Sequence, residues 1–156
     1  MSAMFPKMAD GSPLTTRQAI EDFESDRRIT LPTLYKEFLL ATNGGVPEKP
    51  AFPIEGMAGN PVGIIQVFFG IGVRWPTTEL SYAYDLYTGG FPDGIIPIAD
   101  NGEGSYVCLD LRKGAGRMAF WDKRHFWGTG EWRESDLYHV ANSFEEFLAS
   151  LRPNPY

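Results

Sequence analysis

The sequence lacks several features that would assign it to a membrane, secreted or disulfide-rich class. Its single cysteine excludes an internal disulfide and a zinc site built from clustered cysteines. Its longest apolar run, residues 62–73, is interrupted by Gln66 and is too short to span a bilayer. The first residues, MSAMFPKMADGSPL, have neither the apolar core nor the cleavage pattern of a secretory signal. These absences predict a cytoplasmic protein with no membrane partner.

The sequence also has no run of Lys and Arg. The densest basic spots are residues 27–28 and 123–125, and the formal net charge is −6. Nucleic-acid binding needs a basic patch that displaces phosphate counterions, so the charge argues against it. An acidic surface can instead steer association with a basic protein. The charge therefore favours a protein partner over a nucleic acid.

Aromatic residues are abundant, at 14% of the chain. One interpretation is a hydrophobic core built largely from rings. The alternative is that several Trp and Tyr side chains lie on a recognition surface, where such residues carry much of the binding energy. The length of 156 residues is sufficient for one domain with its own core.

Two helices are expected near the N-terminus and two further along the chain. Thr15 and Gln18 fit a capping box, which predicts a helix that ends near residues 27–28. A second helix should begin at residues 31–33, where Pro suits the first turn, and end at the NGG of residues 43–45. The others are expected from residues 77–79 to residues 89–90 and from Ser143 to about residue 151.

The strands follow from β-branched and aromatic runs. Expected strands cover residues 64–71, 95–99, 106–111 and 118–121, and a Pro-rich loop covers residues 47–61. Consecutive strands joined by tight turns predict an α+β fold, with a mainly antiparallel sheet of about four to six strands and helices packed on one face. We expect one domain at residues 15–152 after an N-terminal extension at residues 1–14.

The stretch IADNGEGSYVCLDL, residues 98–111, concentrates the groups that could carry chemistry. Asp100 and Glu103 flank a glycine turn, but Gly102 and Gly104 occupy positions where a calcium loop needs oxygen ligands. Cys108 lies in an apolar strand, whereas a reactive thiolate needs a cationic, partly open setting. The pattern favours a strand-to-strand turn, with no metal, no cofactor and no catalytic residue.

The order of several motifs resembles the SMI1/KNR4 domain, the core of the SUKH superfamily. The segment that resembles its N-terminal signature is LPTLYKEFL followed by NGG, at residues 31–45. The segments IPIA, VCLD and FWD, at residues 96–122, look like its central strands, and VANSFEEFL, at residues 140–148, is similar to its closing helix. One departure is Ser105, where the family often has Asp or Asn, although Ser can also bond to the backbone of a turn.

The resemblance implies an α+β fold without catalytic residues. For bacterial members it implies an immunity protein that binds and neutralises a cognate polymorphic or contact-dependent toxin, often a nuclease. Fungal relatives act as regulators, so the resemblance also implies an alternative: a regulatory or scaffold module with an endogenous protein partner. A third hypothesis, a small enzyme, would have to use Asp100, Glu103 or Cys108.

Six residues are candidates for contact with a partner, which we expect to be a basic toxin. They lie in loops or at strand ends, where an acidic and ring-rich surface could form; they are Asp100, Glu103, Asp122, Trp127, Glu131 and Trp132. The competing interpretation is that the rings cap the sheet and the acids are simply solvated. We expect the chain to be a monomer or a weak homodimer.

Overall fold

The computed structural model describes residues 5–156 except residues 11, 60, 113 and 115. For Asp10 it describes the backbone only. The helical elements are α1 (Arg17–Arg27), α2 (Thr33–Thr42), η2 (Pro76–Thr78), α3 (Leu80–Tyr87), α4 (Arg124–Thr129), η3 (Glu134–Asp136) and α5 (Phe144–Ser150). The strands are β1 (Met8–Asp10), β2 (Val46–Pro47), β3 (Ala51–Pro53), β4 (Val62–Ile64), β5 (Val67–Phe68), β6 (Ile95–Asp100), β7 (Tyr106–Asp110), β8 (Arg117–Trp121) and β9 (Leu137–Ala141).

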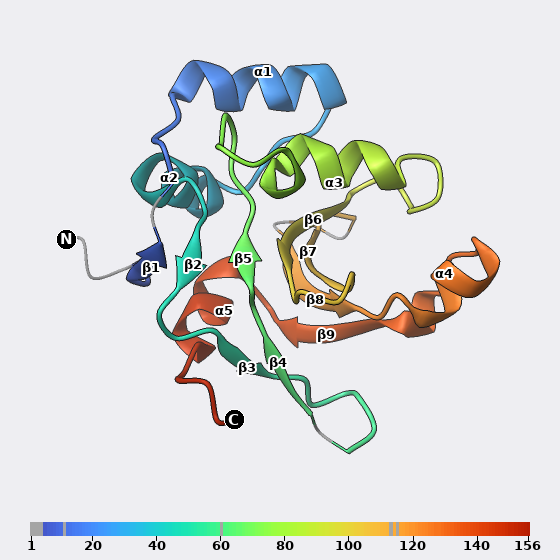
Figure 1. Ribbon diagram of the computed structural model, residues 1–156. Coiled ribbons are helices and arrows are strands. Elements are labelled where there is room, and N and C mark those ends of the chain that lie inside the picture. The colour runs from blue at the N-terminus through green and yellow to red at the C-terminus, as the bar shows by residue number, and fades with distance from the viewer. Residues whose placement is uncertain (1–4, 11, 60, 113, 115) are drawn as a thin grey trace.

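The main sheet is antiparallel and has the order β5-β6-β7-β8-β9 (Figure 1). Each strand from β6 onward pairs with its neighbour in sequence, and two smaller antiparallel pairs, β1-β2 and β3-β4, lie beside it. The predicted α+β class and antiparallel sheet are therefore confirmed. The sequence pattern does not predict strand β9, because Val140 and Ala141 belong to the segment that resembles a closing helix.

The strand expected over residues 64–71 is divided between two sheets. Its first part belongs to β4, which pairs with β3, and its second part to β5, which pairs with β6. Between them the Gln66 amide N–H donates to the Asp100 carbonyl at 2.8 Å. The segment expected to be an irregular loop, residues 47–61, contains β3. A continuous apolar run thus serves two sheets, which periodicity alone does not reveal.

Aromatic rings fill both sides of the main sheet. Tyr106 and Trp121 face each other across β7 and β8, and the Tyr87 ring of α3 lies 5.4 Å from Trp121. Phe120 points to the opposite face, where its ring lies 6.2 Å from Phe52 of β3 and where α5 also packs. Helices therefore meet both faces of the sheet and not one alone, since each face of the central strands is apolar. The core of rings is confirmed.

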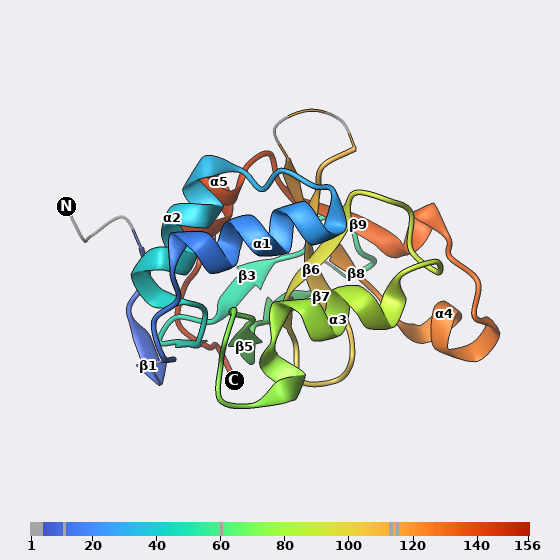
Figure 2. The same ribbon diagram turned by 90° about the horizontal axis from the view of Figure 1, so that it is seen from above.

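Helices α1 and α3 lie side by side (Figures 1 and 2). The Phe23 and Tyr84 rings are 6.0 Å apart, and Arg27 bonds to Asp85 at 2.9 Å. The cap of α1 is Thr16, whose hydroxyl accepts from the Ala19 amide at 3.1 Å. The predicted cap, Thr15, was wrong by one residue, because adjacent threonines fit the same pattern.

Candidate partner-binding surfaces

The turn between β6 and β7 is held by its own side chains. The Asp100 carboxylate accepts from the Gly102 amide at 2.6 Å, and the Asn101 side chain accepts from the Glu103 and Ser105 amides at 2.8 and 3.1 Å. These bonds stabilise the tight turn in the way expected of Asp and Asn side chains. The stretch at residues 98–111 is therefore a structural turn between two strands, as the sequence predicted.

The same turn packs against α4. The backbone of Gly104, at φ +91°, approaches Trp127 so closely that a Cβ atom would overlap the ring. Lys123 donates from its ammonium group to the Glu103 carbonyl and lies 4.3 Å from the centre of the Trp127 ring. The Trp127 indole N–H donates to the Tyr87 hydroxyl at 3.1 Å, yet 57% of this residue is exposed. The fold thus brings Glu103 and Trp127 together; with Lys123 and Glu131 we call them the α4 surface.

Two of the six candidates are tied into the domain. Asp122 is buried, and its carboxylate accepts from Arg124 at 2.6–3.1 Å. The hydrogen bonds from Arg124 lower the pKa of Asp122. Trp132 is half-buried with its ring 4.9 Å from Phe91. Asp122 and Trp132 therefore have structural partners within the fold, and Asp122 is held by an ion pair and is not simply solvated.

The remaining two candidates, Asp100 and Glu131, have different surroundings. Asp100 lines a hollow of about 720 Å³ that also contacts Gln66 and Trp75. Glu131 is exposed just after α4, and its amide donates to the Thr129 hydroxyl at 3.1 Å. No single acidic surface therefore gathers all six residues.

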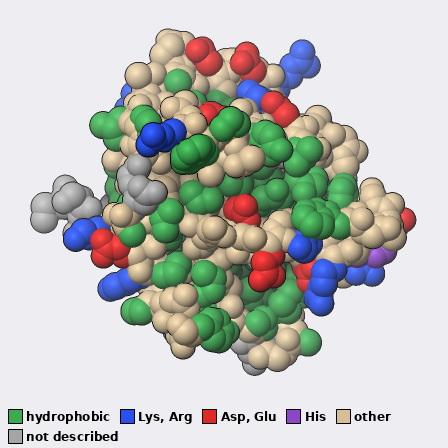
Figure 3. Space-filling model, in the orientation of Figure 1, with side chains coloured by type: hydrophobic (Ala, Val, Ile, Leu, Met, Phe, Trp, Pro, Cys, Tyr) green, Lys and Arg blue, Asp and Glu red, His purple; other side chains and the backbone are tan. Residues whose placement is uncertain are grey.

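The charge around α4 is mixed. Residues 123–125 are Lys, Arg and His, and Figure 3 shows basic and histidine side chains gathered at that corner. Glu103 and Glu131 supply the opposite sign nearby. The acidic surface expected from the net charge of −6 therefore does not lie at α4.

A second exposed apolar area lies on α3. The helix buries Leu80 and Ala83, yet it also exposes Tyr82 and Leu86, which are 47% and 58% accessible. Trp75, just before η2, is 63% accessible. We call Tyr82 and Leu86 the α3 face. Sequence reasoning missed it, although apolar residues four positions apart on the far side of an amphipathic helix are a readable signal.

The α3 face belongs to a segment without positive charge. Residues 75–111 contain six acidic residues and no Lys or Arg. Beside Tyr82 and Leu86, an open hollow of about 660 Å³ is also lined by Glu79 and Asp85. The excess negative charge of the chain is thus concentrated in the segment that carries this apolar face.

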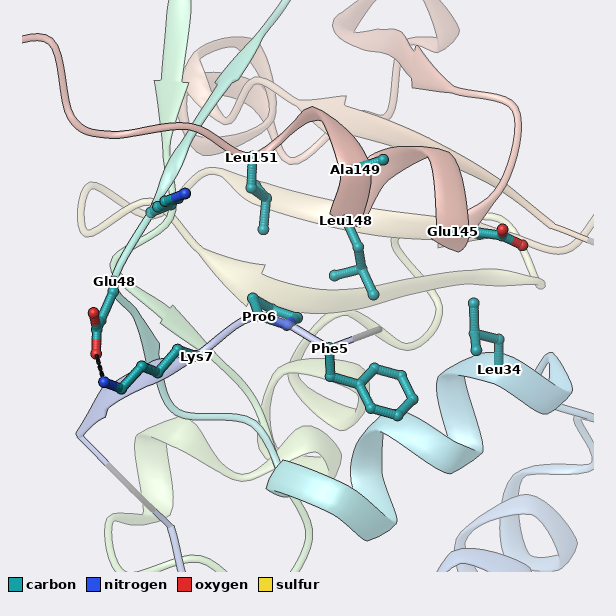
Figure 4. Close-up of a pocket in the computed structure, with 10 residues that line it drawn as sticks. Phe5, Pro6, Lys7, Leu34, Glu48, Glu145, Leu148, Ala149 and Leu151 are labelled. Atoms are coloured by element: carbon teal, nitrogen blue, oxygen red, sulfur yellow. Dashed lines mark ion pairs between the residues drawn. The ribbon is translucent and has the colours of Figure 1, made fainter. Parts of the chain in front are cut away.

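A third hollow lies between the N-terminal segment, α2 and α5 (Figure 4). It measures about 670 Å³, with Phe5, Leu34 and Leu148 among its apolar walls. Lys7 and Glu48 pair with each other at 3.7 Å beside it. The Phe5 ring lies 5.9 Å from a core phenylalanine, and β1 pairs with β2, so residues 5–10 pack on the domain. A small-ligand site needs convergent polar groups, and the charged side chains here lie at the rim.

Cys108 does not have the setting that a catalytic nucleophile needs. Cys108 is fully buried in β7, and its burial, with the charge of Asp110, raises the pKa of the thiol. The thiol therefore stays protonated, whereas a nucleophile must be a thiolate. Across the described residues, no three His, Cys, Asp or Glu side chains are grouped to hold a metal ion. None of the helices in the described part has the length and apolar character to cross a bilayer.

A buried charge network stabilises the end of β7. Asp110 accepts from Arg112 at 2.9 Å and from Arg117 at 3.0 Å, and Arg112 reaches on to Glu134 at 2.7 Å. Burial alone would raise the pKa of Asp110. The bonds from both arginines outweigh it and hold the pKa at about 2, below its ordinary value of 3.8.

This network predicts a stability change in acid. A carboxyl whose pKa is lower in the folded state stabilises the fold above its unfolded pKa. We expect about 2 kcal/mol from Asp110 at neutral pH, lost as the pH falls from about 4 to about 2. Urea unfolding at several pH values should show a shallower acid slope for Asp110→Asn. The exposed Asp93→Asn is the matched control, and equal slopes for both variants would contradict the assignment.

Comparison with known proteins decides the family. The profile of the SMI1/KNR4 family (SUKH-1) matches residues 14–150. The chain belongs to the SMI1/KNR4 family. It is also 29% identical, over 157 aligned positions, to the SPbeta prophage-derived uncharacterized protein YokK of Bacillus subtilis (strain 168), covering 91% of this chain and 77% of that protein.

The motifs that resembled the SMI1/KNR4 family are mostly parts of its fold here. Leu31, Tyr35, Phe38 and Leu39 are at most 1% exposed. Asn43, which ends α2 in the left-handed conformation, is fully buried. The recognised family pattern therefore describes the core, and the exposed α3 face and α4 surface lie mostly outside it.

Proposed function

We propose that this SMI1/KNR4 protein is a non-enzymatic immunity protein that binds a polymorphic or contact-dependent bacterial toxin and thereby neutralises it. The observation that carries the proposal is the family match over residues 14–150, because SUKH proteins are commonly of the immunity type. The buried, protonated thiol of Cys108 supports a mechanism by binding and not by chemistry.

The exposed aromatic residues support a role in protein recognition. Trp and Tyr are enriched among the side chains that dominate binding energy, and Trp127 and Tyr82 are both accessible. The negative net charge supports a basic partner, which a nuclease toxin would be. The proposal places the protein in the cytoplasm as a monomer or weak homodimer, with no nucleic acid, membrane or cofactor involved.

On the α4 surface, we assign Glu103, Trp127 and Glu131 to the partner contact. Trp127 is the anchor, since its ring is held by Lys123 and Tyr87 and is therefore already ordered before binding. Asp100 contributes charge from the neighbouring turn. Asp122 and Trp132 support the surface from within the fold.

The function is tested by co-expression with the toxin encoded next to the gene. We expect wild-type protein to restore growth and to co-purify with the toxin, and Trp127→Ser to weaken the complex about tenfold or more. Trp127→Ser should lower the free energy of unfolding by only about 1 kcal/mol, because most of the residue is exposed. Continued killing with no complex would refute the proposal, and recovery of an endogenous partner in place of a toxin would favour the regulatory alternative.

A further inference from the structure

Helix α3 is apolar on two opposite sides. One side, with Leu80 and Ala83, packs into the core, and the other presents Tyr82 and Leu86 to solvent. A surface helix normally shows one apolar stripe and one polar face, while a helix apolar on both sides is covered on both sides. Tyr82 and Leu86 are large apolar side chains that stay exposed one turn apart, in the manner of interaction sites.

The carboxylates that line the hollow beside this stripe are those of Glu79 and Asp85. Asp85 is paired with Arg27 at 2.9 Å, which offsets its charge. Glu79 accepts from the uncharged amides of Gly72 and Val73 at 2.9–3.1 Å, so its negative charge is not neutralised. Every ionisable side chain that lines the hollow beside Tyr82 and Leu86 is acidic apart from the Tyr82 phenol.

The charge pattern discriminates between possible occupants. A second copy docked symmetrically on α3 would bring the two Glu79 carboxylates to the same interface, which like-charge repulsion disfavours. A segment with Lys or Arg beside apolar side chains would meet Glu79 with the opposite charge while covering Tyr82 and Leu86. The α4 surface, with Lys123 and Arg124, lacks this selectivity.

We propose that the α3 face docks a basic amphipathic helix of the partner protein, its apolar side chains covering Tyr82 and Leu86 and its Lys or Arg side chains facing Glu79. This deepens the proposed function, on which it rests for the source of the helix: the toxin. The apolar stripe supplies contact area, and the Glu79 carboxylate selects the charge and orientation of the helix.

Two synthetic helical peptides test the chemistry. Both carry the same leucine stripe, and the polar face is lysine in one and glutamate in the other. Fluorescence anisotropy should show the lysine peptide binding at least about tenfold more tightly, with an affinity that falls as salt is raised. The double variant Tyr82→Ser/Leu86→Ser should lose about tenfold or more of that affinity, and Tyr156→Ser, which removes another exposed ring near the C-terminus, is the matched control that should retain it.

A variant that adds a positive charge beside the α3 face sharpens the test. Ser81 lines the same hollow, so Ser81→Lys should weaken the lysine peptide and strengthen the glutamate peptide. Equal binding of both peptides, or unchanged binding by a double variant with wild-type thermal unfolding, would overturn the proposal. A wild-type dimer in sedimentation velocity that the double variant abolishes would also overturn it, in favour of a second copy.

Toxin protection separates this inference from the proposed function. If wild-type protein gives no protection but binds the lysine peptide through Tyr82 and Leu86, the immunity function fails and the docking face stands. If the double variant protects as well as wild type, the docking face fails and the immunity function stands.

Discussion

Replacing Asn43 with alanine should lower the free energy of unfolding by about 3–5 kcal/mol. Its side-chain amide donates to the carbonyls of Pro13 and Ile71 at 2.7 and 2.8 Å, and its oxygen accepts from the Ile71 amide at 2.8 Å. The residue is fully buried, so alanine would leave these backbone groups without their partners. Asn43 also has a φ of +49°, which alanine tolerates poorly.

Asn101→Ala is the matched control for Asn43→Ala. Asn101 also accepts from backbone amides, those of Glu103 and Ser105, but it lies in a half-exposed turn where water can replace the bonds. Urea unfolding should show a loss of about 1 kcal/mol for it. Similar losses for the two variants would show that burial of the Asn43 amide does not have the importance assigned to it.

Replacing Trp121 with alanine should cost about 3–5 kcal/mol, because it leaves a cavity at the centre of the aromatic cluster. The Trp121 side chain is fully buried, and its ring lies 4.6 Å from Phe91, 5.4 Å from Tyr87 and 5.8 Å from Tyr106. A typical domain is stable by only about 5–15 kcal/mol, so this variant should be close to unfolding at room temperature.

Two further variants separate cavity formation from loss of an indole. Trp121→Phe keeps most of the ring packing and removes an indole N–H that has no hydrogen-bond partner within the described residues, so it should cost less than half as much as alanine. Trp127→Ala removes an indole that is largely exposed and should cost about 1 kcal/mol. Equal losses at positions 121 and 127, measured by thermal unfolding, would contradict the burial assigned to Trp121.

Local signals in the sequence predicted much of the fold. Ser143 caps α5 by accepting from the Glu146 amide at 3.1 Å, as its capping-box pattern indicated. Asn43 ends α2 in the left-handed conformation, as its NGG context indicated. Such signals act through neighbours in the chain, so one sequence suffices to read them.

Elements that depend on tertiary partners were harder to predict. Helix α4 was not expected, since its stability rests on contacts such as those of Trp127 with Tyr87 and with the β6–β7 turn. The division of residues 64–71 between two sheets depends on which strands lie alongside. Neither set of partners can be recognised from local periodicity.

The candidate surfaces show the same limit. Net charge and ring content suggested a surface for a protein partner, but neither quantity says where on the fold that surface lies. Arg124 turns out to bond with Asp122, and the base-free segment at residues 75–111 carries the apolar α3 face. The helical spacing places Tyr82 and Leu86 on the far side of α3 from Leu80 and Ala83, but only the fold shows that both side chains are exposed.

The central claim is that this SMI1/KNR4 protein acts as a stoichiometric binder of a toxin. The most direct test titrates purified protein into a fixed amount of purified toxin and measures both complex formation and residual toxin activity. We predict that activity falls in proportion to the protein added and ends where every toxin molecule is held in a stable complex. A small fraction of the protein that abolishes toxin activity over time, or inhibition without a complex, would contradict the claim.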